Sequence, residues 1–148
     1  SALTDIAGSS RVFLGGIIAY ANEIKTRLLG VSPEILTSYG AVSFETCETM
    51  LKGIHKLFLP SYAIATTGIA GPEGGSIETP VGTVFIGISI QTEAFLFHCL
   101  FHGDRTDIRR QTTSFVGWFL VSSLTGNNSS LLDPFIVEHR RKTYPEDI

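Results

Sequence analysis

A long glycine-rich stretch between two apolar runs constrains the fold of this chain more than any other feature. The runs at 61–65 and 81–90 have the apolar character of buried strands. Five glycines fall from Gly68 to Gly82, and the chain loses its hydrophobic periodicity there. Loops that only connect two strands are usually a few residues long, whereas long glycine-rich loops are more often functional. We therefore interpret residues 66–82, called the central loop below, as a binding loop rather than a mobile surface connection.

The central loop suits a ligand that carries an anion or a carbonyl group. Glycine lets a ligand approach bare backbone, and threonine hydroxyls and unpaired amides at a strand end can donate to an anion. We assign substrate contacts to Thr67, Gly68, Ala70 and Gly71. The alternative is that these residues only satisfy the geometry of a turn, and both roles are compatible.

Composition excludes several classes of protein. A chain of 148 residues is long enough for one domain with a hydrophobic core. A net charge of −3 without a basic stripe gives no reason to expect nucleic acid as a partner. No apolar run approaches the ~20 residues of a membrane span. Cys47 and Cys99 lie far apart without metal-ligand spacing, which favours reduced, buried thiols and a cytoplasmic location. His98 and His102 are too isolated to indicate a metal site.

Periodicity and capping residues predict a chain that alternates strands and helices. In the helix that begins after Ser43, apolar residues at spacings of three and four predict one buried face, which includes Leu51 and Leu57. Gly53 inside this helix suggests a close contact with the sheet, and His55 is expected on the solvated face. The residues at 12–20 favour a β-strand, and further strands are expected at 61–65, 81–90 and 95–102. Helices are expected at 23–29, from 33, from 44 to 58 and from 105 to about 124.

The end of the chain gives a weaker signal. Residues 127–130 have the composition of a linker, and residues 131–137 are expected to pack onto the body or onto a neighbouring molecule. The polar residues 142–148 are expected to fray. We therefore divide the chain into a domain at 1–126 and a C-terminal extension at 127–148, and leave self-association into a homo-oligomer open.

Four separate stretches resemble the motifs of one known family: FLGGIIAYANEIK at 13–25, GAVS at 40–43, TGIAGP at 67–72 followed by GG at 74–75 and PVG at 80–82, and GDR at 103–105. One such motif alone is weak, whereas four in order are specific for a family. The family that they resemble is the CinA C-terminal domain, also called nicotinamide-nucleotide amidase or PncC. The similarity runs from about Leu3 to about Leu124 in the order of the family's motifs.

The resemblance implies an α/β fold, namely a three-layer α/β/α sandwich around a mixed sheet. It also implies hydrolysis of the carboxamide of nicotinamide mononucleotide to the acid mononucleotide and ammonia, with no metal or organic cofactor. Tyr20 and Lys25 are the implied catalytic residues: a lysine with a lowered pKa can act as a base, and a tyrosine can relay a proton. Arg105, which follows a glycine turn at a helix start, is the implied phosphate ligand. The alternatives are that Lys25 is an exposed helix lysine and Tyr20 an edge aromatic. For Arg105 the alternative is a surface ion pair with Asp104 or Asp107.

The chain departs from the family at its nucleophile. The family's Ser-Cys-Thr-Gly-Gly signature is absent from residues 1–148, and the expected first strand is absent with it. We therefore expect an N-terminally incomplete domain in which the loss of a central strand leaves two sheet edges unpaired. The alternative function is a non-catalytic nucleotide-binding or regulatory domain on the same scaffold.

Overall fold

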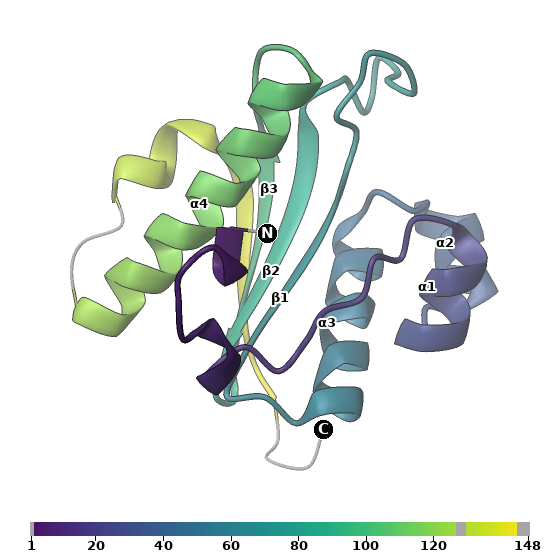
Figure 1. Cartoon of the computed structure of the whole chain (residues 1–148). Coiled ribbons are helices and arrows are strands. Elements are labelled where there is room, and N and C mark those ends of the chain that lie inside the picture. Colours follow the sequence, from purple (N-terminus) through teal and green to yellow (C-terminus); the bar gives the residue numbers. More distant parts are fainter. Residues whose placement is uncertain (1, 127–129, 145–148) are drawn as a thin grey trace.

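The computed structural model describes residues 2–126 and 130–144, which form three layers with a sheet between helices (Figure 1). This arrangement confirms the predicted α/β/α sandwich. In chain order the elements are η1 (Ala2–Thr4), η2 (Ser9–Arg11), α1 (Asn22–Leu29), α2 (Pro33–Tyr39), α3 (Phe44–Phe58), β1 (Tyr62–Gly68), β2 (Thr83–Ile90), β3 (Glu93–Leu100), α4 (Arg105–Thr125), η3 (Ser130–Phe135) and β4 (Ile136–Thr143).

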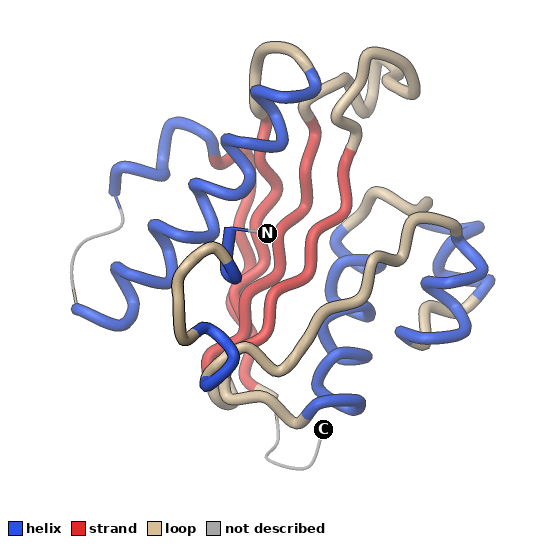
Figure 2. The backbone as a smooth tube through the Cα atoms, in the orientation of Figure 1, coloured by secondary structure: helices blue, strands red, loops and turns tan. Residues whose placement is uncertain are grey.

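The sheet has the strand order β1-β2-β3-β4, and each of its ladders is antiparallel. The described strands therefore form a meander, whereas the resemblance implied a mixed sheet. Figure 2 shows the strands in the centre, with α4 and η3 on one side and α3, α1 and α2 on the other. β2 pairs on both sides and is buried almost throughout, which explains why its sequence is apolar at nearly every position.

Each face of the sheet buries its own hydrophobic core, because successive side chains of a strand point to opposite faces. On β2, Phe85 belongs to the core beneath α3, while Ile86 and Ile88 belong to the core beneath α4. The α3-side core also contains Cys47, Met50, Leu51, Ala63, Ala65 and Leu96, and the α4-side core contains Phe97, Cys99, Phe101, Ile108, Phe115, Val116 and Phe119.

Helix α3 begins where Ser43 caps it, with the Ser43 hydroxyl accepting from the Thr46 amide at 3.1 Å. Leu51 is fully buried as predicted, but Leu57 is 54% exposed, so the buried face ends earlier than the sequence indicates. Gly53 does make a close contact, though not with the sheet. A Cβ atom there would lie 2.3 Å from the Leu29 carbonyl oxygen, so this glycine allows α1 to pack against α3.

The prediction that His55 is solvated was wrong. Its Nε2 atom shares a hydrogen bond with the hydroxyl of Ser89, a fully buried residue of β2. His55 lies one helical turn after Leu51, in the row of residues that borders the buried face. Partial burial lowers the pKa of His55 below its ordinary value of 6.5.

Residues 13–20 follow an extended path but belong to no strand, and Val12 lies in the turn before them (Figure 1). Ile18 is 90% exposed and Val12 81% exposed, whereas Ile17 and Ala19 pack against the α3-side core. The neighbour of Gly15 is the Phe58 ring, which lies 3.1 Å from the position that a Cβ atom would take. β1 is therefore an edge strand within the described residues.

The C-terminal extension supplies β4, which pairs with β3 in antiparallel register. The prediction that residues 131–137 pack back onto the body is thus confirmed, while the prediction of fraying is wrong for 142–144. Lys142 lies in β4 and Tyr144 is buried beside α3. The rest of the expected linker and tail, 127–129 and 145–148, lies outside the described residues.

Candidate active site

The side-chain amine of Lys25 is the most unusual charged group among the predicted site residues. Helix α1 starts after the extended residue Ala21, and this places Lys25 one turn into the helix with only 7% of its surface exposed. Its Nζ atom donates to the carbonyl oxygen of Tyr20 at 3.0 Å and to Oδ1 of Asn22 at 3.5 Å. The turn between the extended segment and α1 therefore holds the amine in one place.

Burial lowers the pKa of the Lys25 amine below its ordinary value of 10.5. Both of its hydrogen-bond acceptors are uncharged oxygens, so neither offsets burial with a full negative charge. A lysine in this state loses its proton more easily and can then accept one from a neighbouring hydroxyl. The geometry is therefore compatible with a general base.

Tyr20 contributes to this arrangement through its backbone. Its carbonyl oxygen accepts the lysine hydrogen bond, while its side chain is 82% exposed. The structure thus brings Tyr20 and Lys25 together through this hydrogen bond between residues five positions apart. The role of the Tyr20 phenol in proton relay stays a prediction.

The base of the central loop is held by backbone hydrogen bonds between its two arms. The Ile69 amide donates to the Thr83 carbonyl at 2.9 Å, and the Gly82 amide donates to the Ile69 carbonyl at 2.8 Å. A Cβ atom at Gly82 would lie 2.0 Å from the Phe101 carbonyl oxygen, and its φ of 99° also requires glycine. Figure 1 shows the loop extending beyond the carboxyl end of β1, at the same end of the sheet as the start of α4.

Arg105 and Gly71, two of the predicted ligand-binding residues, are in direct contact. The Nη1 atom of Arg105 donates to the Gly71 carbonyl oxygen at 2.9 Å, which ties the start of α4 to the central loop. Asp104 and Asp107 form a capping box there, so side chains already satisfy part of this helix N-terminus. Arg105 itself remains exposed, and its guanidinium has further N–H groups that can reach an anion.

The other predicted loop residues are engaged inside the protein. The Thr67 hydroxyl donates to the Ala41 carbonyl at 2.6 Å, which fixes the end of β1 to the connection between α2 and α3. Ala70 packs against the α4-side core, and Gly68 lies against β2, where a Cβ atom would be 2.8 Å from the Thr83 carbonyl oxygen. These contacts account for the residue types by packing, and direct binding of a substrate by them stays a prediction.

The predicted residues thus form two groups, Tyr20 with Lys25 and the central loop with Arg105. Within the described residues, no hydrogen bond or ion pair joins a member of one group to a member of the other. Across residues 2–126 and 130–144, the structure has no cluster of three potential metal ligands. Among those same residues, no helix combines the length and apolarity needed to cross a membrane.

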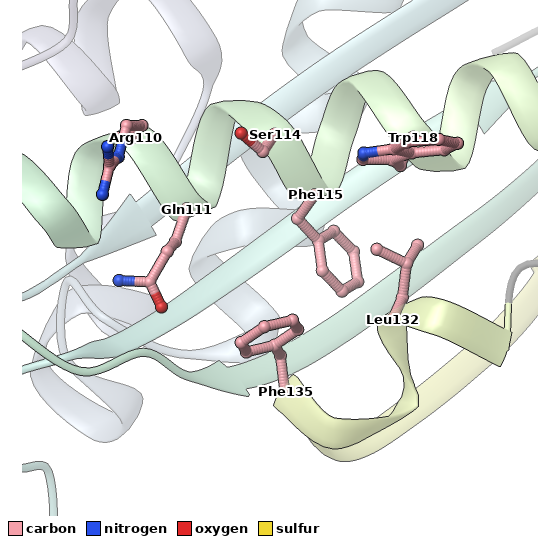
Figure 3. Close-up of a pocket in the computed structure, with 7 residues that line it drawn as sticks. All are labelled: Arg110, Gln111, Ser114, Phe115, Trp118, Leu132 and Phe135. Atoms are coloured by element: carbon pink, nitrogen blue, oxygen red, sulfur yellow. The ribbon is translucent and has the colours of Figure 1, made fainter.

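A cavity of about 470 Å³ lies elsewhere, between α4 and η3 (Figure 3). The central loop does not line it, so this cavity gives no support to the interpretation of the loop as a binding loop. The sequence did not predict this cavity, because the apolar composition of 131–137 indicated only that the segment packs onto the body or onto a neighbouring molecule, not that it faces α4. The lining residues are Arg110, Gln111, Ser114, Phe115, Trp118, Leu132 and Phe135.

Comparison with known proteins finds one family throughout. The family model of the CinA C-terminal domain matches residues 1–123. A relative from Clostridium beijerinckii, named as a competence-damage inducible protein, is 50% identical over 113 residues, which cover 76% of this chain and 28% of the relative. A CinA-like protein of Endomicrobium trichonymphae is 48% identical over 77% of this chain and 27% of its own length. The chain therefore spans little more than a quarter of the curated relatives that it matches.

Solved structures give the same result. The competence/damage inducible protein CihA from Agrobacterium tumefaciens has a TM-score of 0.77 and 40% identity, over 82% of this chain and 74% of that one. The competence damage-inducible protein A from Klebsiella pneumoniae has a TM-score of 0.79 and 30% identity, over 84% of this chain and 77% of that one. β4 and η3 lie beyond residue 123, where the family match ends.

Proposed function

Because the chain belongs to the CinA C-terminal domain family, we propose that it is part of an amidohydrolase that converts nicotinamide mononucleotide to nicotinic acid mononucleotide and ammonia. The observation that carries this proposal is the Lys25 amine, which is buried, oriented by the Tyr20 carbonyl and lowered in pKa. A serine amidase that lacks a histidine base needs such an amine near its nucleophile. The proposal requires a serine nucleophile outside residues 1–148 of the encoded polypeptide.

In the proposed reaction, Lys25 accepts the proton of that serine hydroxyl as the serine oxygen attacks the carboxamide carbon. The bond to nitrogen then breaks, and ammonia leaves after taking a proton back from the Lys25 ammonium. Water hydrolyses the resulting acyl ester, which releases the carboxylate and regenerates the serine. Lys25 alone carries the proton from the serine hydroxyl to the leaving ammonia, so the proposed reaction balances without a metal or cofactor.

The contact between Arg105 and Gly71 supports a mononucleotide as the substrate. It brings a guanidinium to the glycine-rich loop at the start of a helix, where a phosphate group can accept charge-assisted hydrogen bonds. The same contact also favours the alternative function, a nucleotide-binding or regulatory domain without catalysis, because phosphate binding requires no nucleophile.

The full encoded polypeptide should release ammonia from nicotinamide mononucleotide, and Lys25→Ala should lower kcat by about 10²-fold or more while substrate affinity changes little. Lys56→Ala is the matched control, because Lys56 is an exposed lysine of α3. Ammonia release by the unsubstituted protein and both variants is the measurement. Full activity of Lys25→Ala would remove the lysine base, and binding of the mononucleotide without ammonia release would favour the alternative function.

Arg105→Ala should weaken binding of the mononucleotide roughly tenfold or more, because a charge-assisted contact to phosphate is lost. Binding of the corresponding nucleoside, which lacks that phosphate, should change much less. Isothermal titration calorimetry with both ligands measures the difference, and Arg109→Ala, an exposed arginine of the same helix, is the control. Equal losses for the two ligands would assign Arg105 to holding the loop rather than to binding phosphate.

A further inference from the structure

The cavity between α4 and η3 is a half-open hollow with an aromatic and polar lining. Its volume of about 470 Å³ falls within the range of ligand pockets. Figure 3 shows Phe115 pointing from α4 toward η3, which contributes Leu132 and Phe135 to the lining. Trp118 lies toward one end of the lining and Arg110 toward the other (Figure 3). The walls therefore offer aromatic and apolar surface over most of the length of the cavity and a cation at one end.

Helical spacing explains how α4 presents these groups together. Arg110, Ser114 and Trp118 follow one another at intervals of four residues, so they lie along one side of the helix. The eight residue steps from Arg110 to Trp118 correspond to about 12 Å along the axis. A two-ring aromatic molecule with an acidic substituent matches that length.

The Arg110 guanidinium can turn toward a ligand. Its present partner is the Asp107 carboxylate at 3.1 Å, and the two side chains are 75% and 40% exposed. An exposed pair of this kind contributes little stability. Asp107 is also committed to the capping box of α4, where its Oδ2 accepts from the Asp104 amide. The acid is thus anchored at the helix start, while the arginine lies on the side that borders the cavity.

Gln111 forms a fixed polar wall rather than a mobile one. Its Nε2 atom donates to the His102 carbonyl oxygen at 2.6 Å, which holds the amide against the end of β3. Phe115 and Leu132 are almost fully buried, so the floor of the cavity belongs to the packed core. A ligand would therefore enter a largely formed site that is open beside Trp118, which is 56% exposed.

We propose that the cavity between α4 and η3 binds a flat aromatic carboxylate, with its rings against Phe115, Phe135 and Trp118 and its carboxylate on Arg110. Aromatic side chains favour stacking with a flat ring system, and arginine matches the two oxygens of a carboxylate. This site shares no residue with the proposed active site and is completed by η3, beyond the family match. It is therefore a second ligand site of this chain, independent of the amidase proposal.

The test uses Trp118, the only tryptophan of the chain, as a reporter. In ¹⁵N-labelled protein its indole N–H gives a single resolved signal, which should shift in a saturable way when 2-naphthoate is added. Arg110→Gln should raise the Kd at least about tenfold, a change of ~1.4 kcal/mol. Arg109→Gln is the matched control, since it removes a neighbouring positive charge of α4 that does not line the cavity.

Two further comparisons test whether the cavity recognises both the carboxylate and the aromatic rings of the ligand. The neutral analogue 2-naphthamide should bind at least several-fold more weakly than 2-naphthoate, and Phe135→Leu should weaken binding of both. The proposal would be overturned if 2-naphthoate, added to about 5 mM, produced no saturable shift of the Trp118 signal. The Kd would then lie above the millimolar range. Equal binding of the acid and the amide, or equal effects of the two arginine substitutions, would also overturn the proposal.

Discussion

Two extended segments of this molecule, residues 12–20 and β4, have opposite relations to the sheet. The first is apolar and carries several large side chains that are mostly exposed, such as Ile18. The second is rich in charge, yet it pairs with β3 along its length. Apolar composition therefore does not decide which segment pairs: within the described residues the outer edge of β1 stays unpaired, while the charged β4 pairs in register with β3.

Charged contacts account for how a polar strand is retained at the edge of the sheet. Lys142 and Tyr144 both contact the Glu48 carboxylate of α3, at 2.5 Å and 3.2 Å, and the Arg140 guanidinium lies 4.0 Å from the centre of the Phe44 ring. β4 therefore combines a backbone ladder with side-chain contacts to a packed helix. Lysine and arginine on an edge strand also discourage pairing with further chains.

The largest expected effect on stability comes from comparing a buried residue of α3, Leu51, with Ile18 in the exposed segment 12–20. Leu51→Ala should lower the free energy of unfolding by about 2–5 kcal/mol, because Leu51 is fully buried beneath β2 and its loss leaves a cavity. Ile18→Ala, the control at a 90% exposed position, should change it by less than about 0.5 kcal/mol. Denaturant unfolding measures both variants, and similar losses would contradict the exposed position of Ile18 in the segment 12–20.

A smaller effect tests the charged contacts of β4. Burial alone would raise the pKa of Glu48, but hydrogen bonds from Lys142 and Lys52 outweigh it and hold this pKa below the ordinary value of 4.5. A carboxylate with a lowered pKa in the folded state contributes stability above its unfolded pKa, and that contribution disappears as the pH falls through the folded pKa. The contribution of Glu48 is therefore present at neutral pH and lost in acid.

Glu48→Gln should accordingly destabilise the protein by about 1 kcal/mol at pH 7, and the difference from the unsubstituted protein should shrink toward zero near pH 3. Amide hydrogen exchange in the β3–β4 ladder locates the effect, and Glu23→Gln, an exposed acid of α1, serves as the control. A difference that stays constant between these pH values would show that Glu48 does not act through its charge.

Much of the fold could be predicted from local patterns. Capping and periodicity predicted α3 from Ser43 onward, and the apolar run at 81–90 predicted the most deeply buried strand, β2. Two details depended on tertiary contacts that no local pattern encodes. Gly53 makes room for α1 rather than the sheet, and His55 reaches Ser89 because it borders the buried face. The sequence did not predict strand β4, because a charged segment gives no sign that a free sheet edge is available for it to pair with.

The site was predicted only through the family's motifs. By sequence alone Lys25 is an ordinary helix lysine, and no pattern in the neighbouring residues shows that the turn at Tyr20 buries its amine. The contact between Arg105 and Gly71 spans 34 residues, so it follows from the meander rather than from sequence spacing. The cavity beneath α4 requires η3 to fold back from beyond the family match, and the sequence offered only a short apolar run as a signal.

The ionisation of Lys25 is the measurement that tests the account most directly, because the proposed chemistry depends on an amine that gives up its proton readily. NMR titration of the lysine side-chain signals in the 148-residue chain, with Lys25 assigned by a Lys25→Arg variant, gives its pKa without any assay of activity. The account predicts a pKa below 10.5, lowered by burial beside the Tyr20 carbonyl. A Lys25 amine that titrates at or above 10.5 would contradict its role as the base.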